Sequence, residues 1–272
     1  MPSARINGID LYYEIHGSGP LLYLISGLGG SARFWEPNLA ALARNHTVVL
    51  HDQRGTDRSE RPETPYSVEL LADDVLALMD HLGHTRARFV GHSTGGAICQ
   101  VLATNTPERV DSMVLYASWP ATDTHFRWCF QFRRAVLDGA GPEAYCHGNI
   151  LFMYPPWYVQ ENAAVLEIEA RNAALMAHPY AVVTARIDAI LAFDWIERLS
   201  AVDTPTLILC AADDILTPPY QSRRLANAIA SSRIEVLETG GHSCSRVVPE
   251  PFNALVSEFF ATAQAASTAA LR

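Results

Sequence analysis

The stretch Phe-Val-Gly-His-Ser-Thr-Gly-Gly at residues 89–96 constrains the fold of this chain more than any other. It places the pattern G-x-S-x-G between an apolar, strand-like run at 86–90 and an apolar, helix-like run at 97–103. A strand, a sharp turn and a helix in this order hold a serine in a strained backbone above the edge of a sheet. The stretch therefore predicts that Ser93 is a nucleophile, and that Gly91 and Gly95 are needed because a side chain would crowd the turn.

Apolar strand patterns alternate with helix-like segments on both sides of this stretch. An N-terminal hairpin is expected around Asn7-Gly8. Apolar or buried strands are expected at 21–25 and 47–50, and further strands at 111–117, 206–210 and 233–237. This alternation predicts an α/β fold with a mostly parallel, doubly wound sheet and an antiparallel N-terminal edge.

Residues 120 to about 200 differ from the rest, because they show helix-like segments, many aromatic residues and no convincing strand. A helical segment between two sheet strands is typical of a cap over the carboxyl edge of the sheet, where open α/β sheets bind ligands. We therefore expect a core domain formed by residues 1–119 and 201–272, with a helical cap at 120–200.

Two further polar signals follow strands that should end at the same edge as Ser93. Asp213 and Asp214 come after the strand at 206–210, and His242 comes after the strand at 233–237. A serine hydroxyl needs a base such as His242 to take its proton, and that base needs a carboxylate to fix its tautomer. Either aspartate could serve, and Asp123, after the strand at 111–117, is a more distant candidate.

The same chemistry needs two N–H groups to hold the negative oxygen that forms during acyl transfer. The residue after the nucleophile, Thr94, begins a helix and has a free N–H. The glycine-rich loop at 26–30 follows a central strand, and its Leu28 N–H is the expected second donor.

Composition excludes several other classes of function. All twenty basic residues are arginine, which excludes Schiff-base chemistry and a phosphate-loop lysine. The net charge of −9 argues against a nucleic-acid partner, and no apolar run approaches membrane-spanning length. The N-terminus lacks a signal pattern, so a cytoplasmic protein is expected. Five scattered cysteines give no metal-binding spacing, and no metal or other cofactor is implied.

Several motifs together resemble the α/β-hydrolases of the pyrimidine-utilisation pathway, which are described as aminoacrylate or carbamate hydrolases. The likeness spans roughly residues 10 to 260 and includes the segments 26–31, 52–56, 91–92, 129–131, 151–155 and 240–242. The core is also similar to that of enol-lactonases and carbon–carbon bond hydrolases. The resemblance favours Asp214 over Asp213, because Asp214 stands four residues before Pro218 in the arrangement usual in this superfamily.

The resemblance to hydrolases of small acids also implies a substrate carboxylate, for which arginine is the natural partner. Arg127 and Arg134 lie seven positions apart on one expected helix and share a face, whereas Arg133 points elsewhere. These two arginines, with Trp119 and Trp157 among the cap aromatics, are the candidate substrate-binding residues.

The sequence thus predicts a serine hydrolase for a small ester, lactone, amide or carbamate-type substrate, acting as a monomer or homodimer. A carbon–carbon bond hydrolase and a cofactor-free perhydrolase would use the same three residues. A non-catalytic receptor for a small molecule is the alternative from another class.

Overall fold

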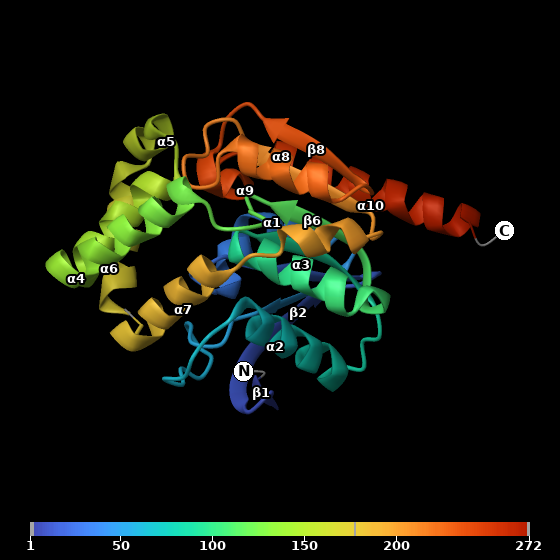
Figure 1. Ribbon diagram of the computed structural model, residues 1–272, viewed down its shortest axis with the longest axis horizontal. Coiled ribbons are helices and arrows are strands. Elements are labelled where there is room, and N and C mark those ends of the chain that lie inside the picture. The colour runs from blue at the N-terminus through green and yellow to red at the C-terminus, as the bar shows by residue number, and fades with distance from the viewer. Residues whose placement is uncertain (1–2, 177, 271–272) are drawn as a thin grey trace.

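The computed structural model describes residues 3–176 and 178–270, and these form one eight-stranded sheet with helices on both faces (Figure 1). The strand order is β1-β2-β4-β3-β5-β6-β7-β8, antiparallel at β1–β2–β4 and parallel elsewhere. The strands are β1 (Ser3–Ile6), β2 (Ile9–Gly17), β3 (Leu21–Ile25), β4 (Thr47–His51), β5 (Ala87–His92), β6 (Val110–Tyr116), β7 (Thr206–Ala211) and β8 (Ser232–Leu237). The predicted parallel sheet with an antiparallel N-terminal edge is confirmed.

The central strands are apolar throughout because both faces of the sheet are covered. In β3, Leu22 and Leu24 point into one core, while Tyr23 and Ile25 point into the other. All six residues of β5 are buried. The turn at Ser93 thus stands at the end of a fully buried strand.

Two groups of helices fill these cores. Helices α2 (Val68–His81), α3 (Thr94–Asn105) and α8 (Pro219–Ala228) cover one face, and α1 (Glu36–Leu42), α9 (Cys244–Val247) and α10 (Pro249–Ala270) cover the other. Short 3₁₀ turns are η1 (Ala32–Trp35), η2 (Pro107–Arg109), η3 (Ile196–Ala201) and η4 (Gly241–Ser243). In the described ranges, no helix is both long enough and apolar enough to cross a bilayer.

Four more helices lie between β6 and β7 in the chain, and we call residues 124–192 the helical insertion. They are α4 (Thr124–Met153), α5 (Pro156–Glu161), α6 (Ala163–Leu175) and α7 (Tyr180–Ala192). Figure 1 shows them together at one side of the sheet. A bridge between Ala121 and Asp194 joins the two ends of the insertion, and α4 bends at Gly141, whose φ is 82°. The helical character predicted for this stretch is confirmed.

Close backbone packing at the end of β5 generates a first prediction. A Cβ on Gly95 would overlap the carbonyl oxygen of Ile25, whereas one on Gly148 of α4 would meet no heavy atom within 4 Å. We expect Gly95→Ala to lower the free energy of unfolding by more than about 3 kcal/mol, because backbone atoms cannot move aside as a side chain can. Gly148→Ala is the control and should be neutral or slightly stabilising in urea denaturation. Equal stability of the two variants would contradict the packing argument.

Candidate active site

Ser93 occupies a strained turn between β5 and α3. Its φ of 52° and ψ of −114° lie where non-glycine residues are rare. The turn is held by the Ser93 N–H, which donates to the Tyr116 carbonyl of the neighbouring strand at 2.8 Å. A Cβ on Gly91 would overlap the Gly95 carbonyl, so the turn can close this tightly only with glycine there. The sharp turn predicted from the sequence is therefore present.

Asp214 and His242 meet after the ends of β7 and β8. The Nδ1 of His242 lies 2.9 Å from Oδ2 of Asp214, and both side chains are buried. A carboxylate only accepts, so Nδ1 carries the hydrogen and Nε2 of His242 is left as an acceptor. Oδ1 of Asp214 also accepts from the backbone N–H groups of Leu216 and Thr217, at 2.8 and 3.0 Å.

The pKa of the Asp214 carboxyl is lowered despite its burial. Burial acts to raise this pKa, but the charge of His242 and the hydrogen bonds from His242 and Thr217 outweigh it. The Thr217 hydroxyl contributes by donating to Oδ2 at 2.8 Å. Asp214 is therefore held ionised beside the imidazole, which suits it to stabilise a protonated His242.

The other two candidate aspartates have different partners. Asp213 accepts from the Thr239 hydroxyl at 2.6 Å and from the Gly241 N–H at 2.8 Å, so it braces the loop that leads to His242. Asp123 caps α4 by accepting from the Phe126 N–H at 2.9 Å. The structure thus brings Asp214, and neither of these, to the imidazole.

His92, next to Ser93, holds the backbone of His242. Its Nε2–H donates to the carbonyl of His242 at 3.0 Å, and the Tyr116 hydroxyl donates to the same oxygen at 2.9 Å. The ring stacks on Phe34 at 4.3 Å, and burial lowers the pKa of His92 well below its ordinary value. His92 is therefore neutral and orients the His242 loop.

The loop at residues 26–30 packs directly on the serine turn. A Cβ on Gly27 would lie 3.0 Å from Nδ1 of His92 and 3.1 Å from Cβ of Ser93. The N–H groups of Leu28 and Thr94 find no acceptor among the residues that the structure describes. Two free N–H donors beside a serine could together hold a developing oxyanion.

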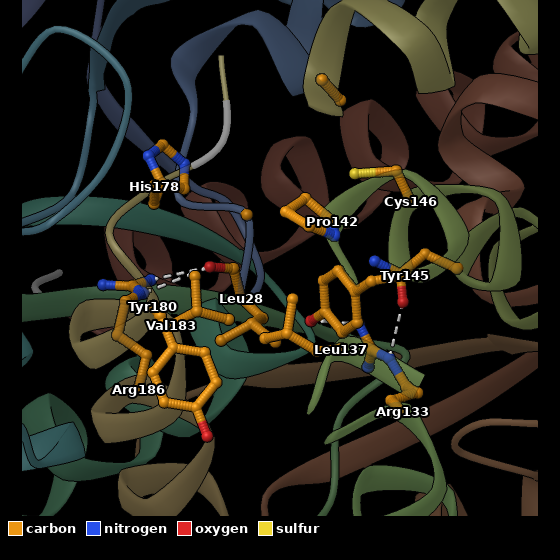
Figure 2. Close-up of a pocket in the computed structure, with 13 residues that line it drawn as sticks. Leu28, Arg133, Leu137, Pro142, Tyr145, Cys146, His178, Tyr180, Val183 and Arg186 are labelled. Carbon is orange, nitrogen blue, oxygen red and sulfur yellow. Dashed lines mark hydrogen bonds between the residues drawn. The ribbon is translucent and has the colours of Figure 1, made fainter. Parts of the chain in front are cut away.

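Arg186 of α7 ties the helical insertion to this loop, a contact that the sequence analysis did not anticipate. Its guanidinium donates to the carbonyl of Leu28 at 3.0 Å (Figure 2). It also donates to the carbonyl of Arg54 and to Oε1 of Gln53, both at 2.7 Å. Burial lowers its pKa to about 10. A single basic residue inside the mostly apolar run at 180–192 was the signal that could have revealed it.

A cavity lies between the sheet edge and the helical insertion. It measures about 550 Å³, and its wall includes Leu28, Ser93, His242, Phe130, Arg133 and Asn149. A second cavity of about 380 Å³, drawn in Figure 2, shares Leu28, Gly29, Arg133, Asn149 and Ala173 with the first. Volumes of this order suit small-molecule ligands.

The expectation that Arg127 and Arg134 face this cavity is wrong. Arg127 is exposed, Arg134 pairs with Asp188 at 2.6 Å, and neither lines the cavity. The two arginines do share a face of α4, but that face points away from the cavity. The buried stripe is formed by Phe126, Phe130 and Arg133, so it is Arg133 that reaches the cavity.

The two tryptophans predicted to bind substrate also lie elsewhere. Trp119 is fully buried and packs against Phe126, with ring centroids 4.4 Å apart. Trp157 is 41% exposed, and its indole N–H donates to the Thr239 hydroxyl at 3.0 Å. Neither residue is part of the wall of either cavity, because one fills the core and the other lies on the surface.

The cysteines form no disulfide, and the potential metal-binding side chains of the described residues do not cluster. All five cysteines are free, and Cys99, Cys210 and Cys244 are buried. Within residues 3–176 and 178–270, no three His, Cys, Asp or Glu side chains come together in the manner of a metal site.

Comparison with known proteins agrees with this architecture. Residues 20–145 match the family model described as the alpha/beta hydrolase fold. A relative from Azorhizobium caulinodans is 42% identical over 261 residues, which cover 95% of this chain and 98% of the relative. The chain therefore belongs to the α/β-hydrolases, and it is a hydrolase.

Within the α/β-hydrolases, the chain groups with relatives that carry the name "Putative carbamate hydrolase RutD". These include the Azorhizobium protein and one from Caulobacter sp. strain K31, which is 40% identical over 265 residues, covering 95% of this chain and 98% of the relative. Among solved structures, the enol-lactonase from Burkholderia xenovorans LB400 has a TM-score of 0.88 at 28% identity, covering 96% of this chain and all of that one. The resemblance noted in the sequence is confirmed.

The contacts of Arg186 generate a second prediction. Arg186→Met should lower the free energy of unfolding by about 2 to 4 kcal/mol, because it removes the donor from two buried oxygen atoms and from the part-buried carbonyl of Leu28. Arg171→Met makes the same chemical change at an exposed arginine of α6, whose partner is Glu167 one turn away, and should alter stability very little. Urea denaturation measures both variants, and equal losses would show that the three hydrogen bonds of Arg186 do not stabilise the fold.

Proposed function

We propose that this hydrolase acts through Ser93, His242 and Asp214, with Ser93 as the nucleophile. The observation that carries the proposal is the 2.9 Å contact between His242 and Asp214, which leaves Nε2 of His242 as an acceptor on the cavity wall that also holds Ser93. The strained Ser93 backbone supports the same assignment, because such strain is typical of a nucleophile turn.

In the proposed reaction, Oγ of Ser93 attacks the substrate carbonyl while Nε2 of His242 takes the hydroxyl proton. The carbonyl oxygen becomes negative and accepts hydrogen bonds from the N–H groups of Leu28 and Thr94. The leaving group then departs with the proton from His242, which leaves an acyl-enzyme. Water, activated by His242, attacks the acyl carbon and releases the acid, and the serine regains its proton.

We propose that the substrate is a small ester, lactone, amide or carbamate-type compound. The curated relatives are named for carbamate hydrolysis, and the solved neighbour is titled an enol-lactonase. Both names describe attack on a carbonyl that bears a heteroatom leaving group. The helical insertion acts as the cap in this proposal, since its residues Phe130, Arg133 and Asn149 contribute to the cavity wall opposite the serine turn.

The nucleophile is tested by Ser93→Ala. Hydrolysis of p-nitrophenyl acetate should fall by several orders of magnitude, on the order of 10⁶ as for a serine protease that loses its nucleophile, while the circular dichroism spectrum stays the same. Substantial activity in a correctly folded Ser93→Ala variant would show that another group attacks the carbonyl.

The assignment of Asp214 as the carboxylate partner of His242 is tested by comparing two isosteric substitutions. Asp214→Asn should reduce kcat by roughly 10⁴, because an amide cannot stabilise the protonated imidazole and favours the wrong tautomer. Asp213→Asn changes a residue that only braces the loop and should cost far less activity. Steady-state rates on the same ester give the ranking, and a larger loss at Asp213 would transfer the role to that residue.

A further inference from the structure

Arg133 is a buried, positively charged side chain that lines both cavities and has few hydrogen-bond partners. Its side chain comes from α4, and the residue is 7% exposed. Nε donates to Oδ1 of Asn149 at 2.8 Å, and Nη2 lies 3.5 Å from the Tyr145 hydroxyl, at the limit of a hydrogen bond. The guanidinium also lies 4.6 Å from the centre of the Phe130 ring. No carboxylate of the described residues lies within 4.0 Å of it, and Nη1 donates to none of those residues.

The other buried arginines show how unusual this arrangement is. Arg54 forms a close ion pair with Asp74 at 2.6 Å, and Arg88 lies 3.6 Å from Asp111. Arg186 lacks a carboxylate but donates to three oxygen atoms. A buried charge is costly unless it is paired or fully hydrogen-bonded, and Arg133 is neither. The free donors of Arg133 are therefore available to a ligand in the cavity.

The surroundings of Arg133 favour a negative ligand. The wall of the second cavity includes Arg133, Arg186 and His178, and none of the described residues that line it is acidic (Figure 2). The pKa of His178 is lowered to about 4, first by burial and then by the positive charges of Arg61 and Arg186. Two acidic residues border the first cavity, but Glu169 is paired with Arg246 at 2.5 Å and Glu36 is exposed.

We propose that Arg133 anchors a carboxylate of the substrate that is distinct from the carbonyl attacked by Ser93; this proposal rests on the proposed function. The planar guanidinium can donate to both oxygens of a carboxylate. Arg133 and Ser93 line the same cavity, so one molecule can contact both. In a carbamate ion the charged group and the reacting carbon are the same, and the ion has a single carbon. Two adjoining cavities of about 550 and 380 Å³ therefore fit a longer acid that carries a separate ester, lactone or amide carbonyl.

The first experiment compares two substrates that differ in one charge. They are the mono-p-nitrophenyl ester of glutaric acid and the corresponding ester of glutaramic acid, in which a neutral amide replaces the carboxylate. The wild-type protein should prefer the acid by at least tenfold in kcat/KM. Arg133→Gln should reduce that preference by about 10- to 100-fold, mainly through KM, because charge-assisted hydrogen bonds are lost. The neighbouring Arg134→Gln, on the outer face of α4, is the matched control and should keep the wild-type preference.

The second experiment measures binding without turnover. Succinate, glutarate and adipate are titrated calorimetrically into Ser93→Ala and into the same variant that also carries Arg133→Gln. The best-bound diacid should lose at least tenfold in affinity when Arg133 is changed. If Arg133→Gln fails to fold, Arg133→Lys keeps the charge without the planar fork, and its preference for the acidic ester should fall below that of the wild type.

The outcomes separate this inference from the proposed function. An unchanged preference in Arg133→Gln, or in Arg133→Lys if that variant is needed, overturns the carboxylate anchor even if Ser93→Ala is inactive. Binding of none of the three diacids, or equal binding with and without Arg133, overturns it too. Conversely, full activity of Ser93→Ala with diacid binding that depends on Arg133 would reject the proposed nucleophile and keep the anchor.

Discussion

The close approach of three backbones at the end of β5 is the constraint on which the rest of the site depends. The turn at Ser93 folds back so tightly that Gly91 contacts Gly95, and Gly95 in turn lies against the carbonyl of Ile25 at the end of β3. This packing fixes the start of α3 against the loop at 26–30. As a result, the loop that carries Leu28 lies directly against the turn that carries Ser93, and the backbone N–H groups of Leu28 and Thr94 have no acceptor among the described residues.

The remaining polar groups are held by the same edge of the sheet. Parallel strands end at a common edge, and this brings the loops after β7 and β8 beside the serine turn. His92 and Tyr116, from β5 and β6, donate to the carbonyl of His242 and so connect its loop to the centre of the sheet. Asp214 is held by backbone N–H groups and Thr217, which together with His242 keep its pKa low in a buried position.

The helical insertion contributes charge as well as shape. Arg186 donates to the carbonyl of Leu28, so the orientation of the loop at 26–30 depends on helix α7, far along the chain. Arg133 of α4 brings a second guanidinium to the cavity, and among the described residues its one short hydrogen bond is to Asn149 at 2.8 Å. The donors of Arg186 are therefore bound by oxygen atoms of the protein, whereas Arg133 retains donors for a ligand.

The sequence by itself determined the sheet, the turn at Ser93 and the placing of Asp214 and His242 at strand ends, because strand periodicity and glycine sterics act locally. Only the tertiary structure decided which aspartate meets His242, since Asp213 and Asp214 are adjacent and loop packing turns them to different partners. It also decided which face of α4 looks inward. The spacing of Arg127 and Arg134 gave a shared face correctly, but the burial of Phe126 and Phe130 turned that face outward and brought Arg133 to the cavity. Helical rotation about its own axis is set by the surface against which a helix packs, and that surface comes from distant parts of the chain.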